Sequence, residues 1–141
     1  MFLQEARVSN LELLCGLINL DMRAEMMDGA KQFNAGEYWE AHEVWEIPWN
    51  AAKSAGDSIE ASYVQGLILL AAAIHKRRHY DNPRGGQLNY DKALRKLEVV
   101  PTGYSQKDGF DLEQLKLEVL TALEHPELFP QLPVPSSKTV E

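Results

Sequence analysis

Apolar residues recur at intervals of three and four along most of this 141-residue chain, a spacing that predicts amphipathic helices. Ser9 and Glu12 form a capping box, and the apolar residues after it predict a first helix that runs to about Leu20. Asp21 is expected to cap a second helix, which Gly36 ends. The apolar face of this second helix would consist of Met22, Met26, Ala30 and Phe33.

The segment 33–49, which holds all three tryptophans, predicts a third helix. Pro48 has no amide hydrogen, so we expect it to kink or end this helix, with a loop of small residues over 51–57. Ser58 would then cap the longest helix, which continues to about His79 along an almost unbroken apolar stripe. Gly66 lies in that stripe and predicts the close approach of a neighbouring helix, for which we expect the helix that carries His42.

The C-terminal half contains two more helical patterns. After a turn over 81–86, a fifth helix is expected from about Gln87 to Val99, followed by a polar loop rich in glycine. Asp111 is expected to cap a sixth helix, which ends before Pro126. The proline-rich tail should be extended and lie on the helices as far as about residue 134.

No segment combines a period of two with β-branched residues, so we expect no sheet. The predicted fold is all-α: a compact bundle of about six helices with tetratricopeptide-like hairpin packing. We expect one domain over residues 1–141, with a core at about 22–123 and an extended tail over 126–141.

Composition narrows the class of protein. A hydrophobic fraction of 45% and a charged fraction of 25% are typical of a globular domain. No uninterrupted apolar run is long enough to span a bilayer, and the N-terminus has no signal-peptide pattern, so we expect a cytoplasmic protein without membrane association. The net charge of −7 argues against nucleic acid as the main partner, because phosphate contacts need an excess of cations. A homodimer is left open.

His42 and Glu46 are the candidate catalytic residues. They are one helical turn apart, with His42 in the apolar stripe of its helix and Glu46 at the edge of that stripe, so their side chains can meet. A carboxylate beside an imidazole orients the ring and raises its pKa, which suits proton transfer. No nucleophile is identifiable, because Cys15 lies in an apolar run and is expected to be a buried hydrophobe. Whether the protein is an enzyme is therefore left open.

The run His42-Glu43-x-x-Glu46 shares its first two positions with the HExxH motif of zinc proteases but lacks the second histidine. We therefore predict neither a metal site nor a cofactor. A metal held by His42 and Glu46 with His75 or His79 is the alternative, although the latter two fall off the buried stripe of their helix.

Aromatic residues near the His42 and Glu46 pair predict an apolar pocket with few polar groups, as ligand sites usually have. The expected lining residues are Tyr38, Trp45, Trp49 and Tyr63, with Arg78 as a clamp for an anion. The leading hypothesis is binding of a small polar or anionic molecule, with turnover as one version of it. The alternative is a tetratricopeptide-like module for protein interactions, in which the His, Glu and Trp cluster is purely structural.

Two resemblances bear on these alternatives. Five residues fall at the spacing of one tetratricopeptide hairpin, namely Gly29, Gly36, Tyr38, Ala41 and Trp45. A longer resemblance extends over about residues 30–123 and is carried by Phe33-Asn34-x-Gly36-x-Tyr38-x-x-Ala41-His42-Glu43-x-x-Glu46-x-x-Trp49 and by Tyr63-x-Gln65-Gly66-Leu67-Ile68.

In these motifs the chain resembles the prokaryotic family catalogued as domain of unknown function 309. The resemblance implies a compact all-helical bundle in which the positions of His42, Glu46 and Trp49 are signature residues. It implies no reaction, because none is assigned to the family.

Overall fold

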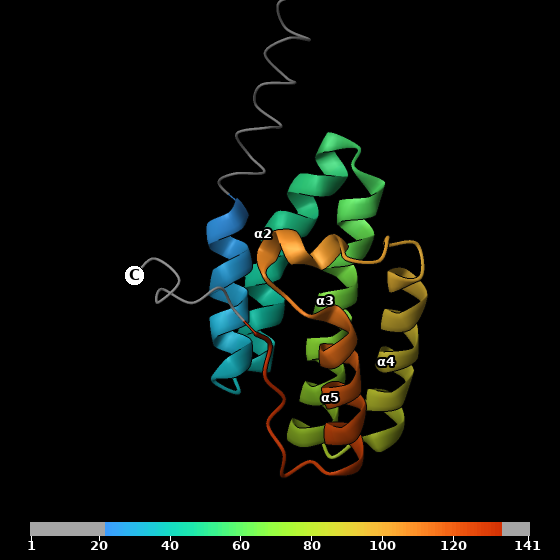
Figure 1. Ribbon diagram of the computed structural model, residues 1–141. Coiled ribbons are helices and arrows are strands. Elements are labelled where there is room, and N and C mark those ends of the chain that lie inside the picture. The colour runs from blue at the N-terminus through green and yellow to red at the C-terminus, as the bar shows by residue number, and fades with distance from the viewer. Residues whose placement is uncertain (1–21, 134–141) are drawn as a thin grey trace, which may run out of the picture.

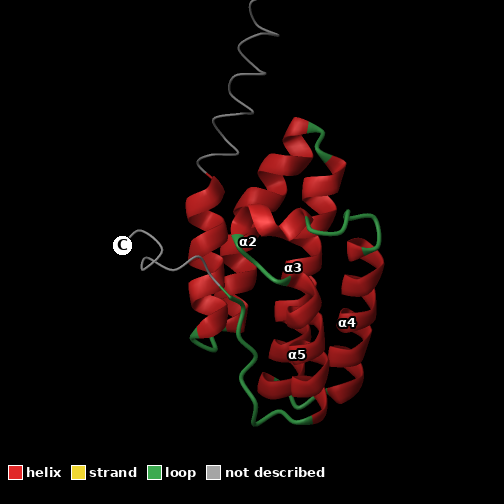
Figure 2. Cartoon of the chain, in the orientation of Figure 1, coloured by secondary structure: helices red, strands yellow, loops and turns green. Residues whose placement is uncertain are grey.

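A computed structural model describes residues 22–133, and these residues form helices and loops without any strand (Figures 1 and 2). Residues 22–34 are helical, and the labelled elements that follow are α2 (Tyr38–Ala55), α3 (Ser58–His79), α4 (Pro83–Leu97), the 3-10 helix η1 (Tyr104–Asp108) and α5 (Leu112–Glu124). The all-α prediction is confirmed. The expected first helix, its capping box, Cys15 and the Asp21 cap of the second helix lie outside the described residues.

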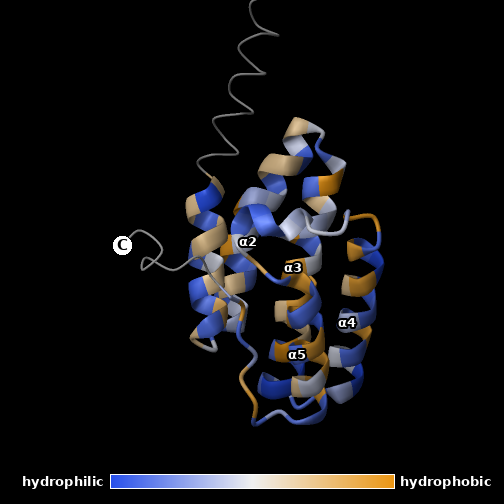
Figure 3. Cartoon of the chain, in the orientation of Figure 1, coloured by the Kyte–Doolittle hydropathy of each residue, from blue (hydrophilic) through white to orange (hydrophobic). Residues whose placement is uncertain are grey.

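Helix α3 is the centre of the bundle and packs against α2, α4 and α5. Hydrophobic residues follow α3 and the adjacent sides of α4 and α5 (Figure 3). By length and composition α3 is also apolar enough to cross a membrane, the one such helix among residues 22–133. However, half of its most apolar window is buried against the rest of the protein, as is usual for the core helix of a globular domain.

Two glycines allow helices to approach closely. A Cβ atom on Gly29 would lie 2.2 Å from Nε1 of Trp45, and a Cβ atom on Gly66 would lie 2.3 Å from a methyl carbon of Leu97. The close approach expected at Gly66 is therefore present, but its partner is α4. The prediction that the helix carrying His42 would fill this place was wrong, because Gly66 faces α4 and not α2.

Pro48 does not end its helix. Helix α2 continues through Pro48 to Ala55 and ends at Gly56, whose φ of +75° is the left-handed conformation that favours glycine. The expected loop over 51–57 was therefore wrong. Pro48 is buried, so its packing offsets the helical hydrogen bond that its missing N–H cannot donate. The cap of α3 is Asp57 rather than Ser58, since Asp57 Oδ1 accepts a hydrogen bond from the Glu60 N–H at 3.0 Å.

Helix α4 begins four residues earlier than expected. Pro83 is its first residue, where a missing N–H costs nothing, and Asn82 Oδ1 caps it by accepting from the Gly85 N–H at 2.8 Å. Gly86, which we placed in a turn, instead lies inside the helix. There it lets α4 approach α3, because a Cβ atom would lie 3.0 Å from the carbonyl oxygen of Ala73.

The chain after α5 returns along the helical segment 22–34. Asn34 pairs with the backbone of Leu132: its Nδ2 donates to the Leu132 carbonyl at 2.7 Å, and its Oδ1 accepts from the Leu132 N–H at 2.6 Å. The Leu132 side chain is fully buried. The last described residues are thus held against the first described helix.

Gly29→Ala should destabilise the protein by about 1–2 kcal/mol, because overpacking against the buried Trp45 indole outweighs the gain of about 1 kcal/mol in helix propensity. Urea unfolding measures the change. In a Trp45→Phe background the substitution should cost less, since part of the indole is gone. An equal cost in both backgrounds would contradict this contact as the reason for the glycine.

Candidate functional site

His42 and Glu46 are in contact, as their spacing predicted. His42 Nε2 lies 3.5 Å from Glu46 Oε2, and the imidazole is 18% exposed while the carboxylate is 45% exposed. The opposite ring nitrogen, Nδ1, is buried and has no hydrogen-bond partner among the described residues. The indole of Trp39 stacks on the imidazole with a centroid distance of 4.6 Å. The catalytic role assigned to this pair stays a prediction.

The two tryptophans that were predicted to line the pocket lie in different surroundings. Trp45 is fully buried, and its Nε1 donates to the Met26 carbonyl at 3.2 Å, so the indole joins α2 to the helical segment 22–34. Trp49 is only partly buried, and the Lys53 ammonium lies 3.8 Å from the centroid of its ring. Trp49 lines a separate shallow hollow beside the turn between α2 and α3.

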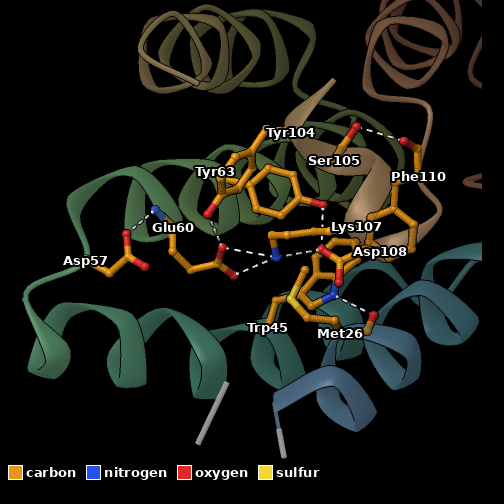
Figure 4. Close-up of polar contacts among 10 residues, drawn as sticks. All are labelled: Met26, Trp45, Asp57, Glu60, Tyr63, Tyr104, Ser105, Lys107, Asp108 and Phe110. Atoms are coloured by element: carbon orange, nitrogen blue, oxygen red, sulfur yellow. Dashed lines mark hydrogen bonds and ion pairs between the residues drawn. The ribbon is translucent and has the colours of Figure 1, made fainter. Parts of the chain in front are cut away.

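Tyr63 belongs to a partly buried polar network that joins η1 to α3 (Figure 4). Its hydroxyl donates to Asp108 Oδ2 at 2.9 Å, and Lys107 Nζ lies 3.1 Å from the same oxygen. Glu60 accepts from the hydroxyl of Tyr104 at 2.5 Å and pairs with Lys107 at 3.1 Å. The network anchors η1, and its polar groups bond to one another rather than to a cleft.

The phenols of this network stay protonated. Burial raises the pKa of Tyr63 far above its ordinary value, and the Asp108 carboxylate raises it further by repelling a phenolate and by accepting its hydrogen bond. Burial and the hydrogen bond to Glu60 raise the pKa of Tyr104 in the same way. Both phenols therefore act as hydrogen-bond donors throughout the physiological pH range.

The other two predicted ligand residues, Tyr38 and Arg78, lie together in a cleft of about 750 Å³. The cleft forms where α2 begins and α3 ends. The structure places none of the other predicted site residues in its lining, which consists of Gly36, Glu37, Tyr38, Trp39, Glu40, His75, Arg78, His79 and Tyr80.

The hydroxyl of Tyr38 is the unusual polar group of this cleft. The side chain is 3% exposed, yet its hydroxyl oxygen has no hydrogen-bond partner among the described residues. Burial raises the pKa of Tyr38 to about 12, although the nearby Arg78 guanidinium opposes the rise. Most buried polar groups in proteins have a hydrogen-bond partner. This protonated phenol, a donor without an acceptor, is an exception.

Arg78 is held in place by the chain after α5. Its Nη1 donates to the carbonyl oxygens of Pro126 and Leu128. Its guanidinium carbon lies 3.9 Å from the centroid of the Phe129 ring. Nε and Nη2 make no hydrogen bond to the described residues, so one edge of the guanidinium remains available to a ligand.

Aromatic rings form the wall of the cleft. His75 and His79 stack at 4.9 Å with an interplanar angle of 10°, and Tyr80 meets both rings edge-on. Trp39 reaches this group from α2, since its ring centroid lies 5.2 Å from that of His75. Two histidines, His42 and His75, thus lie against Trp39. Sequence reasoning missed His75, His79 and Tyr80 as lining residues, although the off-stripe position of the histidine pair was the signal that they faced outward.

Burial lowers the pKa of His75, and the neighbouring His79 lowers it further. His42 acts in the same direction, while the Glu40 carboxylate opposes the shift. No group of three His, Cys, Asp or Glu side chains within residues 22–133 is arranged to hold a metal ion. The cleft combines the Arg78 guanidinium with a wall of aromatic rings.

Tyr63→Phe should lower the free energy of unfolding by about 1–2 kcal/mol, because it removes the hydrogen bond to the buried Asp108 carboxylate. Urea denaturation measures the loss. Tyr80→Phe is the matched control: that ring is 64% exposed, so its hydroxyl should contribute little. Equal stability of the wild type and Tyr63→Phe would show that the network does not anchor η1.

The lowered pKa of His75 should appear in the pH dependence of stability. The unfolded chain protonates His75 at its ordinary pKa of 6.5, above the pKa in the folded state. The neutral ring therefore contributes stability above pH 6.5, and this contribution is lost as the pH falls through the folded-state pKa.

His75→Gln removes that contribution, so its melting temperature should fall less than that of the wild type between about pH 7 and 5. Lys76→Gln, at the exposed position next along the helix, should follow the wild-type curve. Parallel curves for His75→Gln and the wild type would contradict the assignment.

Comparison with known proteins agrees with the motifs that fold into this region. A comparison with curated proteins gave no match. The model of one family matches residues 26–88, which include the whole cleft lining as well as His42, Glu46 and Trp49. By this match, residues 26–88 belong to the family described as domain of unknown function (DUF309).

Proposed function

We propose that the cleft between the start of α2 and the end of α3 binds a small anionic molecule. The observation that carries the proposal is the buried, unpartnered hydroxyl of Tyr38 beside the Arg78 guanidinium. An anionic oxygen bound there accepts from both groups and satisfies the phenol. Hydrogen bonds to a charged acceptor are roughly twice as strong as neutral ones, which suits a site with two donors.

The charges around the cleft are mixed. Glu37 and Glu40 line it together with Arg78, while His75 and His79 add positive charge only when they are protonated. A general positive field therefore does not attract the ligand. Selectivity for an anion rests instead on the directed donors of Arg78 and Tyr38, which are fixed by Phe129 and by burial.

Binding without turnover is the version that this geometry favours. A catalytic version assigns proton transfer to His42, whose Nε2 is held by Glu46. His42, however, lies behind the Trp39 ring and does not line the cleft, so a ligand would have to pass that ring to reach it. In the proposal, the pair of His42 and Glu46 supports the Trp39 ring on the side away from the cleft. The proposal keeps the cytoplasmic location that the sequence predicts.

The interaction-module alternative required an open groove beside a fully packed His42. The imidazole is partly exposed, with a buried nitrogen that lacks a partner, so it is not fully packed. It is not enclosed in a pocket of its own either. The cleft one turn away, with its free donors, is the feature that favours a small ligand over a protein partner.

Titration with inorganic phosphate and with acetate, followed by two-dimensional NMR of the backbone amides, tests the proposal. Amides of the cleft should shift with at least one of the two anions. Arg78→Gln should abolish the shifts, and Tyr38→Phe should weaken binding on the order of tenfold through the loss of one charged hydrogen bond. Tyr38→Phe should also retain or raise stability, because the hydroxyl that it removes has no partner to lose.

Arg84→Gln is the matched control, because it removes one exposed arginine outside the cleft. Its binding should equal that of the wild type. The proposal is wrong if neither anion shifts the cleft amides of the wild type, or if Arg84→Gln weakens binding as much as Arg78→Gln does.

A further inference from the structure

We infer that the ligand of the cleft is an anion that carries a flat aromatic ring. This inference rests on the proposed function and names the class of molecule that the same cleft takes. Five of the nine lining residues, Tyr38, Trp39, His75, His79 and Tyr80, carry aromatic rings, and the donors proposed for the anion are the Tyr38 hydroxyl and the Arg78 guanidinium. The cleft thus offers two kinds of recognition, and a bare inorganic anion would use only one of them.

The rings of the wall are accessible as well as numerous. Trp39 is 44% exposed and Tyr80 is 64% exposed. Trp39 is nevertheless held rigidly, because His42 stacks on it at 4.6 Å and His75 lies 5.2 Å away. A large exposed ring that is fixed in orientation is a platform for stacking, since little conformational entropy is lost when a ligand ring covers it.

The size and the remaining polar groups fit the same class. The cleft volume of about 750 Å³ lies in the range of sites that hold drug-sized molecules and far exceeds the space that a phosphate ion needs. Glu37 and Glu40 have no role in binding an anion, but their carboxylates accept hydrogen bonds from N–H groups on a ring. An anionic group at Arg78 and a flat nitrogen-bearing ring at Trp39 would together use the guanidinium, the Tyr38 hydroxyl and the two carboxylates of the cleft.

Two matched pairs of probes test the inference by isothermal titration calorimetry. The first is AMP with ribose 5-phosphate, which share the phosphate and the sugar but differ in the flat base. The second is benzoate with cyclohexanecarboxylate, which share the carboxylate and the ring size but differ in flatness. Stacking of a base on an aromatic side chain corresponds to a preference of about 5- to 150-fold for the flat member.

Trp39→Leu should reduce that preference to less than about twofold while it retains binding of the non-aromatic member, because leucine preserves apolar packing but provides no platform. Trp49→Leu is the control, since Trp49 lies in a different hollow and should leave the preference unchanged. A preference in the phosphate pair alone would identify a nucleotide-like ligand, and one in the carboxylate pair alone an aromatic acid. Either result supports the inference.

The outcomes also separate this inference from the proposal beneath it. If both members of each pair bind equally well, the anion site stands and the aromatic class is overturned. If no probe binds, and phosphate and acetate also do not shift the cleft amides, the inference and the proposed anion site are overturned together. If Trp39→Leu and the wild type show the same preference, the ring wall is not the platform and the inference fails.

Discussion

The insertion of the Trp45 indole between two helices is the contact on which the position of the cleft depends. The indole fits against the bare backbone of Gly29 and bonds to the Met26 carbonyl, so it fixes the helical segment 22–34 against α2. Phe33 transmits that alignment, because its ring contacts both Trp45 and Tyr38. Tyr38 is thereby buried at the start of α2, in the place where its hydroxyl finds no partner.

The cleft arises because a hairpin has one closed and one open end. The tight turn at Gly56 and Asp57 joins α2 to α3, so the two helices run antiparallel, and the start of α2 meets the end of α3 (Figure 1). The last turn of α3 carries basic side chains, which suit the negative end of a helix dipole. The same residues thus complete their helix and furnish the site.

The hydrophobic periodicity predicted those features that depend on residues within one helix. It found α3 to its last residue, the Asp111 cap of α5 and the contact of His42 with Glu46, because each depends on residues a few positions apart. It failed where tertiary packing decides: Pro48 continues a helix because it is buried, and Gly66 receives α4 instead of α2. The cleft joins residues some forty positions apart, so spacing along the chain gave its Tyr38 and Arg78 but not the rings beside them.

The support of Arg78 has a consequence for how such a site changes in evolution. Its acceptors are the main-chain carbonyls of residues 126 and 128, which every amino acid carries, so substitution at these positions leaves the hydrogen bonds intact. Only a change in the path or length of the segment removes them. The segment also lies beyond residues 26–88, the part that defines the family match. Members whose chains end soon after the matched part would need another means of holding this arginine, even if they share every signature residue.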